Sequence, residues 1–197
     1  MSERNFEQNK GSIRQEVETQ FLNVSDAPFE IVNYGRRMGY LDYLADFSVR
    51  RRGACSAKHY YLGHKLEQLG AGVGYVSTPF YWHELPVGFN DTLRELAKKI
   101  PLQYHLSLQV SFGGSIDSLD ATWDRPLAKM GFAVANIVNS KIDSPLGVLP
   151  AGEPTIHFSG EERWQWIANL KKEMPRVAEV QEFYSSLNKW VEEIRMG

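Results

Sequence analysis

The chain has 197 residues, a formal net charge of −2, 43% hydrophobic residues and a single cysteine, Cys55. A chain of this length forms one domain with a real core, which excludes a mainly disordered protein. The near balance of acidic and basic residues gives no reason to expect nucleic acid or an anionic membrane as a partner. One cysteine excludes an internal disulfide and a cysteine-rich zinc site and favours a reducing, cytoplasmic location.

The N-terminal region is polar and has no apolar stretch of the signal-peptide type. We expect residues 1–20 to form a loose tail ahead of a single domain over residues 21–197. Ser25 or Asp26 is a suitable N-cap and Pro28 suits a first helical turn, so the apolar residues that follow predict one helix or two short ones. These apolar residues are Phe29, Ile31, Val32, Leu41 and Leu44.

A mostly buried helix is predicted over residues 55–69. The segment contains no proline, has leucines at spacings of four and three, and stops at Gly70. The helix begins at Cys55 or just before it, directly after the basic turn Arg50-Arg51-Arg52-Gly53. Cys55 therefore lies at a helix N-terminus, next to a turn that is either a set of surface ion pairs or an attraction for an anionic substrate.

Three strands are predicted over residues 73–82, 102–111 and 115–123, with a short helix over 92–99 capped by Asp91. If Gly113-Gly114 is a two-residue hairpin turn, the numbers of opposed residues sum to 227. His105 then faces Thr122, and Asp120 lies on the diagonal, on the same face of the sheet. A register shifted by one whole pair places His105 directly opposite Asp120, whereas a one-residue bulge would separate them.

The C-terminal part is predicted to be a loop over residues 124–158 followed by two amphipathic helices within 160–195 that break near Pro175. We expect these helices, which carry Trp164, Trp166 and Trp190, to close the core or to form a homodimer contact. The fold class that results is α+β, with a cysteine-headed helix packed on an antiparallel sheet and flanking helices.

Cys55, His105 and Asp120 form a candidate catalytic triad. A helix N-terminus and an imidazole stabilise a thiolate, and a carboxylate orients the imidazole so that it can accept and return a proton. Several histidines and aspartates are rivals, and a lone cysteine is commonly an inert core residue. The rivals are His83 as the base, His59 as a residue that tunes the thiol, and Asp117 and Asp124 as the carboxylate.

The chain resembles the transglutaminase-like superfamily of cysteine enzymes over about residues 40–132. The segment Arg51-Arg52-Gly53-Ala54-Cys55-Ser56-Ala57-Lys58-His59 is similar to the family's basic, glycine-containing turn into a helix headed by cysteine. Leu66-Glu67-Gln68-Leu69-Gly70 leads into a strand, His105 begins an alternating strand, and Asp120 is followed by Ala121-Thr122-Trp123, in the family's order. The papain-like fold of this superfamily is more distantly related to that of the arylamine N-acetyltransferases.

The resemblance implies a thiol enzyme that transfers acyl groups or hydrolyses amides, with a peptide or a small amide or acyl compound as substrate. It implies Cys55 as nucleophile, His105 as general base and acid, and Asp120 as the residue that orients His105. We expect no cofactor and no metal, since no calcium-binding acidic cluster is evident in the sequence. Unlike some members, the chain has no tryptophan upstream of Cys55 that could stabilise an oxyanion. A non-catalytic scaffold with the same fold and an acyl-CoA-dependent N-acyltransferase remain as alternatives.

Overall fold

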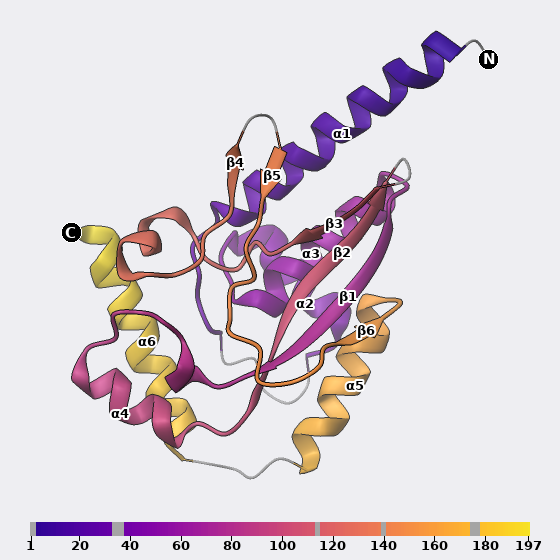
Figure 1. The fold of residues 1–197 in the computed structure, drawn as a ribbon. Coiled ribbons are helices and arrows are strands. Elements are labelled where there is room, and N and C mark those ends of the chain that lie inside the picture. Colours follow the sequence, from indigo (N-terminus) through magenta and orange to yellow (C-terminus); the bar gives the residue numbers. More distant parts are fainter. Residues whose placement is uncertain (1–2, 33–37, 113–114, 139–140, 174–177) are drawn as a thin grey trace.

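A four-stranded antiparallel sheet lies at the centre of the fold (Figure 1). The computed structural model describes residues 3–32, 38–112, 115–138, 141–173 and 178–197. The strand order is β3-β2-β1-β6. The strands are β1 (Gly72–Phe80), β2 (Gln103–Phe112), β3 (Ser115–Leu119) and β6 (Thr155–His157). The three expected strands are confirmed, although β3 ends at Leu119 rather than at residue 123.

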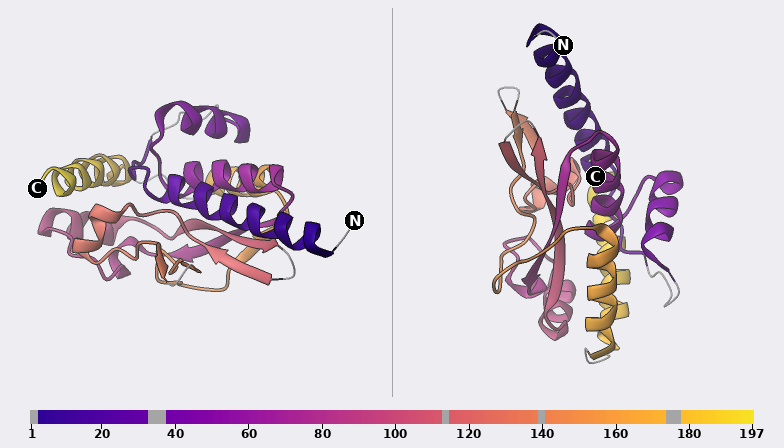
Figure 2. Two further views of the ribbon diagram at one scale, coloured as in Figure 1. Left: turned by 90° about the horizontal axis from the view of Figure 1, so that it is seen from above. Right: turned by 90° about the vertical axis from the view of Figure 1, so that its right-hand side faces the viewer.

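Helices cover one face of this sheet. The cysteine-headed helix α3 (Cys55–Gln68) packs on β1 and β2, and α1 (Glu3–Ser25), α2 (Tyr40–Arg50) and α5 (Gly160–Glu173) pack around it. Figure 2 shows α2 as a further layer outside the helices that touch the sheet. The class is therefore α+β, as the sequence predicts.

The remaining elements lie beside the sheet or at one end of it. Helix α6 (Glu179–Met196) pairs there with α4 (Asp91–Lys99), and two 3₁₀ helices, η1 and η2, contact this pair. A short two-stranded ribbon, β4-β5, stands apart from the main sheet (Figure 1). The bounds of these elements are η1 (Trp82–Glu84), η2 (Arg125–Met130), β4 (Asn136–Val138) and β5 (Lys141–Asp143).

The expectation of a loose N-terminal tail over residues 1–20 is wrong, because Glu3 to Ser25 form helix α1. Val17, Phe21 and Val24 recur at spacings of four and three and are buried against the other helices. Three anchoring residues at these spacings hold one face of a helix against the core. Around them the polar residues Arg14, Gln15 and Thr19 are exposed, so the polar composition that suggests a tail is compatible with a helix.

The expected helix start near Pro28 is also wrong, because residues 28–32 form no helix and the helix that follows, α2, begins only at Tyr40. Backbone hydrogen bonds of residues 28–32 go to side chains of distant elements: the Phe29 N–H donates to Asp124 Oδ1 at 2.7 Å and the Ile31 N–H to Asn188 Oδ1 at 2.9 Å. These long-range partners satisfy the amides that a helix would otherwise satisfy.

The predicted loop over 124–158 is only partly a loop, since it contains η2, β4, β5 and β6. Strands of three residues are too short to leave an alternating pattern in the sequence. Two further expectations, the Gly113-Gly114 turn and the break at Pro175, lie outside the described residues. The cap of α4 is Asn90, whose side chain accepts the Leu93 N–H, rather than Asp91.

The register between β2 and β3 is the one predicted from a two-residue turn. Leu108 pairs with Leu119 and Val110 with Asp117, so opposed residue numbers sum to 227. The strand pairing stops at Leu119, and the next residue, Asp120, begins the loop that leads to η2. Asp120 is therefore held at the end of the hairpin, on the diagonal from His105.

Two apolar cores meet beside this point. The first lies between the sheet and helices α1 to α3 and is mainly aliphatic and tyrosine-rich. The second is mainly aromatic and lies between η1, α4, η2 and α6, with Phe80, Trp82, Trp123, Phe183 and Trp190 among its members. Cys55 packs on the first core and Ala54 on the second, so the start of α3 lies at their junction.

Candidate active site

Cys55 is the first residue of α3. The residue before it, Ala54, is extended (φ −80°, ψ −177°) and provides no side-chain cap, so the first amides of the helix point outward without a capping group. The thiol is half-buried and belongs to the wall of a cavity of about 120 Å³. The helix start is the first of the two conditions expected for a reactive thiol, and a neighbouring imidazole is the second.

His105 and Asp120 form a short, buried hydrogen bond. The His105 Nε2–H donates to Asp120 Oδ2 at 2.6 Å, and the two residues are only 2% and 4% exposed. This contact confirms the carboxylate–imidazole pair expected from the hairpin register. Because Nε2 is occupied by Asp120, the other ring nitrogen, Nδ1, is left for the thiol.

The carboxylate of Asp120 is held by backbone donors as well. The Gly147 N–H donates to Oδ2 at 2.7 Å and the Thr122 N–H donates to Oδ1 at 3.1 Å. The Ser144 hydroxyl accepts from the Asp120 N–H and donates to the Asp120 carbonyl at 3.1 Å. Asp120 therefore cannot turn away from His105 without leaving several buried donors unsatisfied.

The charges of the three groups depend on one another. Burial opposes ionisation of the Cys55 thiol, but a hydrogen bond from His105, its positive charge and the Leu106 N–H outweigh this and lower the Cys55 pKa to about 7. Burial disfavours the charged His105 ring, yet Asp120 and Cys55 raise the His105 pKa to about 10.

The pKa of Asp120 completes this arrangement. Burial acts to raise it, but the charge and hydrogen bond of His105 hold the pKa well below the usual range of an aspartate. Between pH 7 and pH 10 the triad therefore favours a thiolate, an imidazolium and a carboxylate.

A second buried histidine, His59, holds the loop that carries Asp120. The Ala121 N–H donates to His59 Nε2 at 2.8 Å, so the ring carries its proton on Nδ1, which donates to the Cys55 carbonyl at 2.8 Å. Burial lowers the His59 pKa to about 4, which keeps this ring neutral. His59 thus links the first turn of α3 to the loop that carries Asp120. Its place one turn after Cys55 in the sequence predicts that it lies near the thiol but not that it binds this loop.

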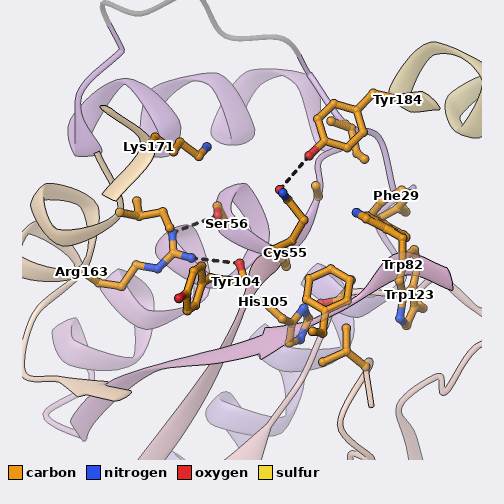
Figure 3. Close-up of a pocket in the computed structure, with 17 residues that line it drawn as sticks. Phe29, Cys55, Ser56, Trp82, Tyr104, His105, Trp123, Arg163, Lys171 and Tyr184 are labelled. Carbon is orange, nitrogen blue, oxygen red and sulfur yellow. Dashed lines mark hydrogen bonds between the residues drawn. The ribbon is translucent and has the colours of Figure 1, made fainter. Parts of the chain in front are cut away.

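The cavity beside Cys55 has two unlike walls (Figure 3). On one side are Phe29, Trp82 and Trp123, which belong to the aromatic core. On the other side are Arg163 and Lys171, both from α5. Cys55 lies between the two walls, above His105.

The rival residues lie elsewhere or have other partners. His83 is exposed and stacks on Tyr81, with ring centroids 5.3 Å apart. Asp117 lies on β3 opposite Val110 and is exposed. The carboxylate of Asp124 is bound to Arg195 at 2.7 Å. None of these three residues lines the cavity beside Cys55.

The basic turn does not supply charge to the cavity. Arg50 pairs with Glu30 at 3.0 Å, and Arg52 pairs with Glu30 and Glu192, each at 3.4 Å. Arg51 lies over the Tyr61 ring, 5.3 Å from its centroid. The ion-pair interpretation holds for Arg50 and Arg52, and the arginine and lysine that do line the cavity come from α5.

Arg163 is the site residue that reasoning from the sequence missed. The helix that carries it was assigned an apolar face of Trp164, Ile167 and Leu170, which places Arg163 among polar positions. In the fold, Arg163 is buried and shares its side of the helix with Ile167 and Lys171, at successive spacings of four. That spacing is the only signal in the sequence that could have identified it.

Comparisons with protein-family models, with curated proteins and with solved structures gave no match to this chain. No helix in the described part of the chain is both long and apolar enough to cross a membrane. Within the same residues, no group of three or more histidine, cysteine or acidic side chains is arranged to hold a metal ion. The functional argument therefore depends on the geometry of the site.

Proposed function

We propose that this chain is a transglutaminase-like cysteine enzyme that transfers acyl groups or hydrolyses amides. The observation that carries the proposal is the 2.6 Å contact between His105 and Asp120 directly beside a half-buried thiol at a helix start. The lowered pKa of Cys55 and the raised pKa of His105 support the same conclusion, since they describe a nucleophile and an acid ready at neutral pH.

The proposed reaction has two stages. The Cys55 thiolate attacks the carbonyl carbon of an amide, and the His105 imidazolium gives its proton to the departing nitrogen as the C–N bond breaks. The resulting thioester is then attacked by water or an amine, which passes a proton to His105. The S–C bond breaks and the thiolate returns. Asp120 stabilises the imidazolium throughout.

An anionic tetrahedral intermediate in this reaction needs hydrogen-bond donors. The Cys55 backbone N–H, at the start of α3, is one suitable group. Two buried polar atoms have no hydrogen-bond partner in the described part of the chain, Trp82 Nε1 and Thr122 Oγ1, and both residues line the cavity. These two are the candidates for the second donor, and Trp82 reaches the cavity through the fold although it follows Cys55 in sequence.

Alkylation of Cys55 tests the proposal directly, because the chain has no other cysteine. We expect the rate of reaction with iodoacetamide, followed by intact mass, to rise through a pKa near 7, as the interactions of the thiol require. A rise near pH 8.5, the value for a free thiol, or an unreactive Cys55 would contradict an activated nucleophile and favour a non-catalytic scaffold. Cys55→Ser gives the unlabelled baseline.

A further inference from the structure

A buried arginine forms part of the cavity wall beside Cys55. Arg163 is 2% exposed, and its guanidinium donates from Nε to Ser77 Oγ at 3.2 Å and from Nη2 to the Tyr104 carbonyl at 3.4 Å. Its Nη1 donates to Ser56 Oγ at 3.2 Å and to the Tyr60 hydroxyl at 2.9 Å. These neutral partners fix the position of the guanidinium without neutralising its charge, and they leave one Nη2 hydrogen unused.

No aspartate or glutamate in the described part of the chain forms a salt bridge with Arg163. The two acidic residues next to it in sequence bond elsewhere. Glu162 accepts the Phe158 N–H at 2.8 Å, and Glu161 accepts from Gln165 Nε2 at 3.0 Å. Within the chain, the nearby anion is the Cys55 thiolate, whose pKa the Arg163 charge helps to lower. A buried charge is costly unless an opposite charge accompanies it, and no carboxylate in the described part of the chain accompanies Arg163, so the cavity beside it also favours an anionic group of a ligand.

A second cation lies on the same side of the cavity. Lys171 follows Arg163 by two turns of α5 and is exposed, and Figure 3 shows it above Arg163, across the cavity from the aromatic wall. An anion at this place would therefore meet the guanidinium of Arg163 and the ammonium of Lys171 on one side of the cavity. Lys172, the next residue, bonds to Asn169 at 2.8 Å and does not line the cavity.

We propose that Arg163 and Lys171 bind a carboxylate of the substrate, so that the enzyme acts on acyl compounds or amides with a carboxylate close to the scissile carbonyl. This inference rests on the proposed function. A planar guanidinium pairs well with a carboxylate, and a cavity of about 120 Å³ admits only a small group there. The apolar part of the substrate then packs against Phe29, Trp82 and Trp123 on the opposite wall.

A matched pair of alkylating agents tests this site without requiring turnover. Bromoacetylglycine carries a carboxylate, and bromoacetylglycinamide is its neutral counterpart. With each reagent the Cys55 sulfur forms a bond to the methylene carbon and bromide leaves. The quantity to measure is the ratio of the two rates, charged over neutral, because a change in the reactivity of the thiol itself affects both rates equally.

We expect the ratio to fall about tenfold in Arg163→Gln, which loses a charge-assisted hydrogen bond, and about threefold in Lys171→Gln, whose cation is exposed. Lys172→Gln removes the same charge one position further along and should leave the ratio unchanged. If Arg163→Gln fails to fold, the comparison of Lys171→Gln with Lys172→Gln decides. Equal ratios in these two variants and the unaltered protein would overturn the inference.

The two proposals fail in distinguishable ways. If iodoacetamide reacts with a pKa near 7 but the charged-to-neutral ratio does not respond to either α5 substitution, the carboxylate site is wrong and the thiol enzyme stands. If the ratio falls as expected but Cys55 titrates like a free thiol, the anion site is real and the proposed catalysis is wrong.

Discussion

Two buried carboxylates follow strand β3, and their surroundings differ. Asp120 accepts from His105 and from the Gly147 and Thr122 amides. Asp124 accepts from the Phe29 amide at 2.7 Å and from two nitrogens of Arg195, at 2.7 and 2.8 Å. The two aspartates are similarly buried, at 4% and 2% exposed, and each has one cationic side chain as a partner.

The partner decides what each carboxylate does. Arg195 keeps its proton at all accessible pH values, so its pair with Asp124 only joins α6 to the loop after β3 and to the segment at Phe29. His105 can lose and regain its proton, and it lies between a carboxylate and a thiol at an open cavity. An aspartate thus joins distant segments of the fold in one place and belongs to the proposed proton-transfer chain in the other.

The largest effect that this comparison predicts is the loss of hydrolytic activity in Asp120→Asn. An amide in place of the carboxylate removes the charge that raises the His105 pKa, and the imidazolium that supports the thiolate is lost. We expect hydrolysis of p-nitrophenyl acetate to slow by about 10³-fold or more. The pKa of Cys55 in the alkylation profile should move from about 7 towards that of a free thiol.

The pH profile of the unaltered protein sets the reference for this variant. Hydrolysis of an amide substrate, whose departing nitrogen needs a proton, should rise through pH 7 as Cys55 ionises and fall through pH 10 as His105 loses the proton it gives to that nitrogen. If Asp120→Asn keeps both limbs of this profile, His105 does not depend on Asp120 and the triad is wrong.

The second effect is on stability and concerns Asp124→Asn. The substitution leaves Arg195, whose side chain is only 12% exposed, without its buried charged partner, and we expect a loss of about 3 kcal/mol in urea unfolding. Glu192→Gln is the matched control, because Glu192 also contacts Arg195 but is 42% exposed, and it should cost about 0.5 kcal/mol. The dependence of Cys55 alkylation on pH should stay unchanged in both variants. A shifted profile in Asp124→Asn would mean that Asp124, like Asp120, affects the thiol.

The parts of the site that sequence reasoning found are those fixed by local rules. The proline-free segment ending at Gly70 gives the helix and places Cys55 at its start, and the two-glycine turn gives the register that brings Asp120 near His105. Parity along the strand also separates Asp117 from Asp120 correctly. Each of these steps needs only a period or a turn length, which a single sequence contains.

The parts that were missed depend on contacts between distant segments. Phe29 lies outside any helix and its amide donates to Asp124, and Arg163 is buried because Ser77 and Tyr60 bind its guanidinium. His59 holds Ala121 across 62 positions of sequence. Hydrophobic periodicity does not predict such long-range polar contacts, since an arginine on a helix gives the same sequence pattern whether its side chain faces water or a cavity.

Gly147→Ala should produce the third effect, on rate rather than on stability. A Cβ at this position would lie 2.8 Å from Trp123 Nε1 and 3.1 Å from Asp120 Oδ2, so the loop must move and weaken the Gly147 N–H bond to the carboxylate. We expect p-nitrophenyl acetate hydrolysis to fall about tenfold to a hundredfold through misplacement of Asp120. Gly70→Ala, at a helix end far from the cavity, should lower the melting temperature without this loss of rate. Equal rates in the two variants would show that the position of Asp120 does not depend on the hydrogen bond from Gly147.

Lys58→Met should give the smallest effect and should stabilise the protein. Lys58 is fully buried, and its ammonium donates only to the Ser25 carbonyl, at 3.3 Å, among the described contacts; burial lowers its pKa to about 7 despite the nearby Asp124. Since the ordinary pKa of lysine is about 10.4, the unfolded chain binds this proton more strongly between pH 7 and 10, and the stability cost of Lys58 is greatest below pH 7. The gain in the free energy of unfolding on substitution, about 1–2 kcal/mol, should therefore be larger at pH 6 than at pH 9 in urea unfolding.

Lys65→Met is the control for this prediction. Lys65 lies further along the same helix and is partly exposed, so its substitution should show no such pH dependence. A loss of stability in Lys58→Met at pH 6 would mean that the ammonium stabilises both Asp120 and Asp124. The two aspartates would then share a cation, and the contrast drawn between their surroundings would fail.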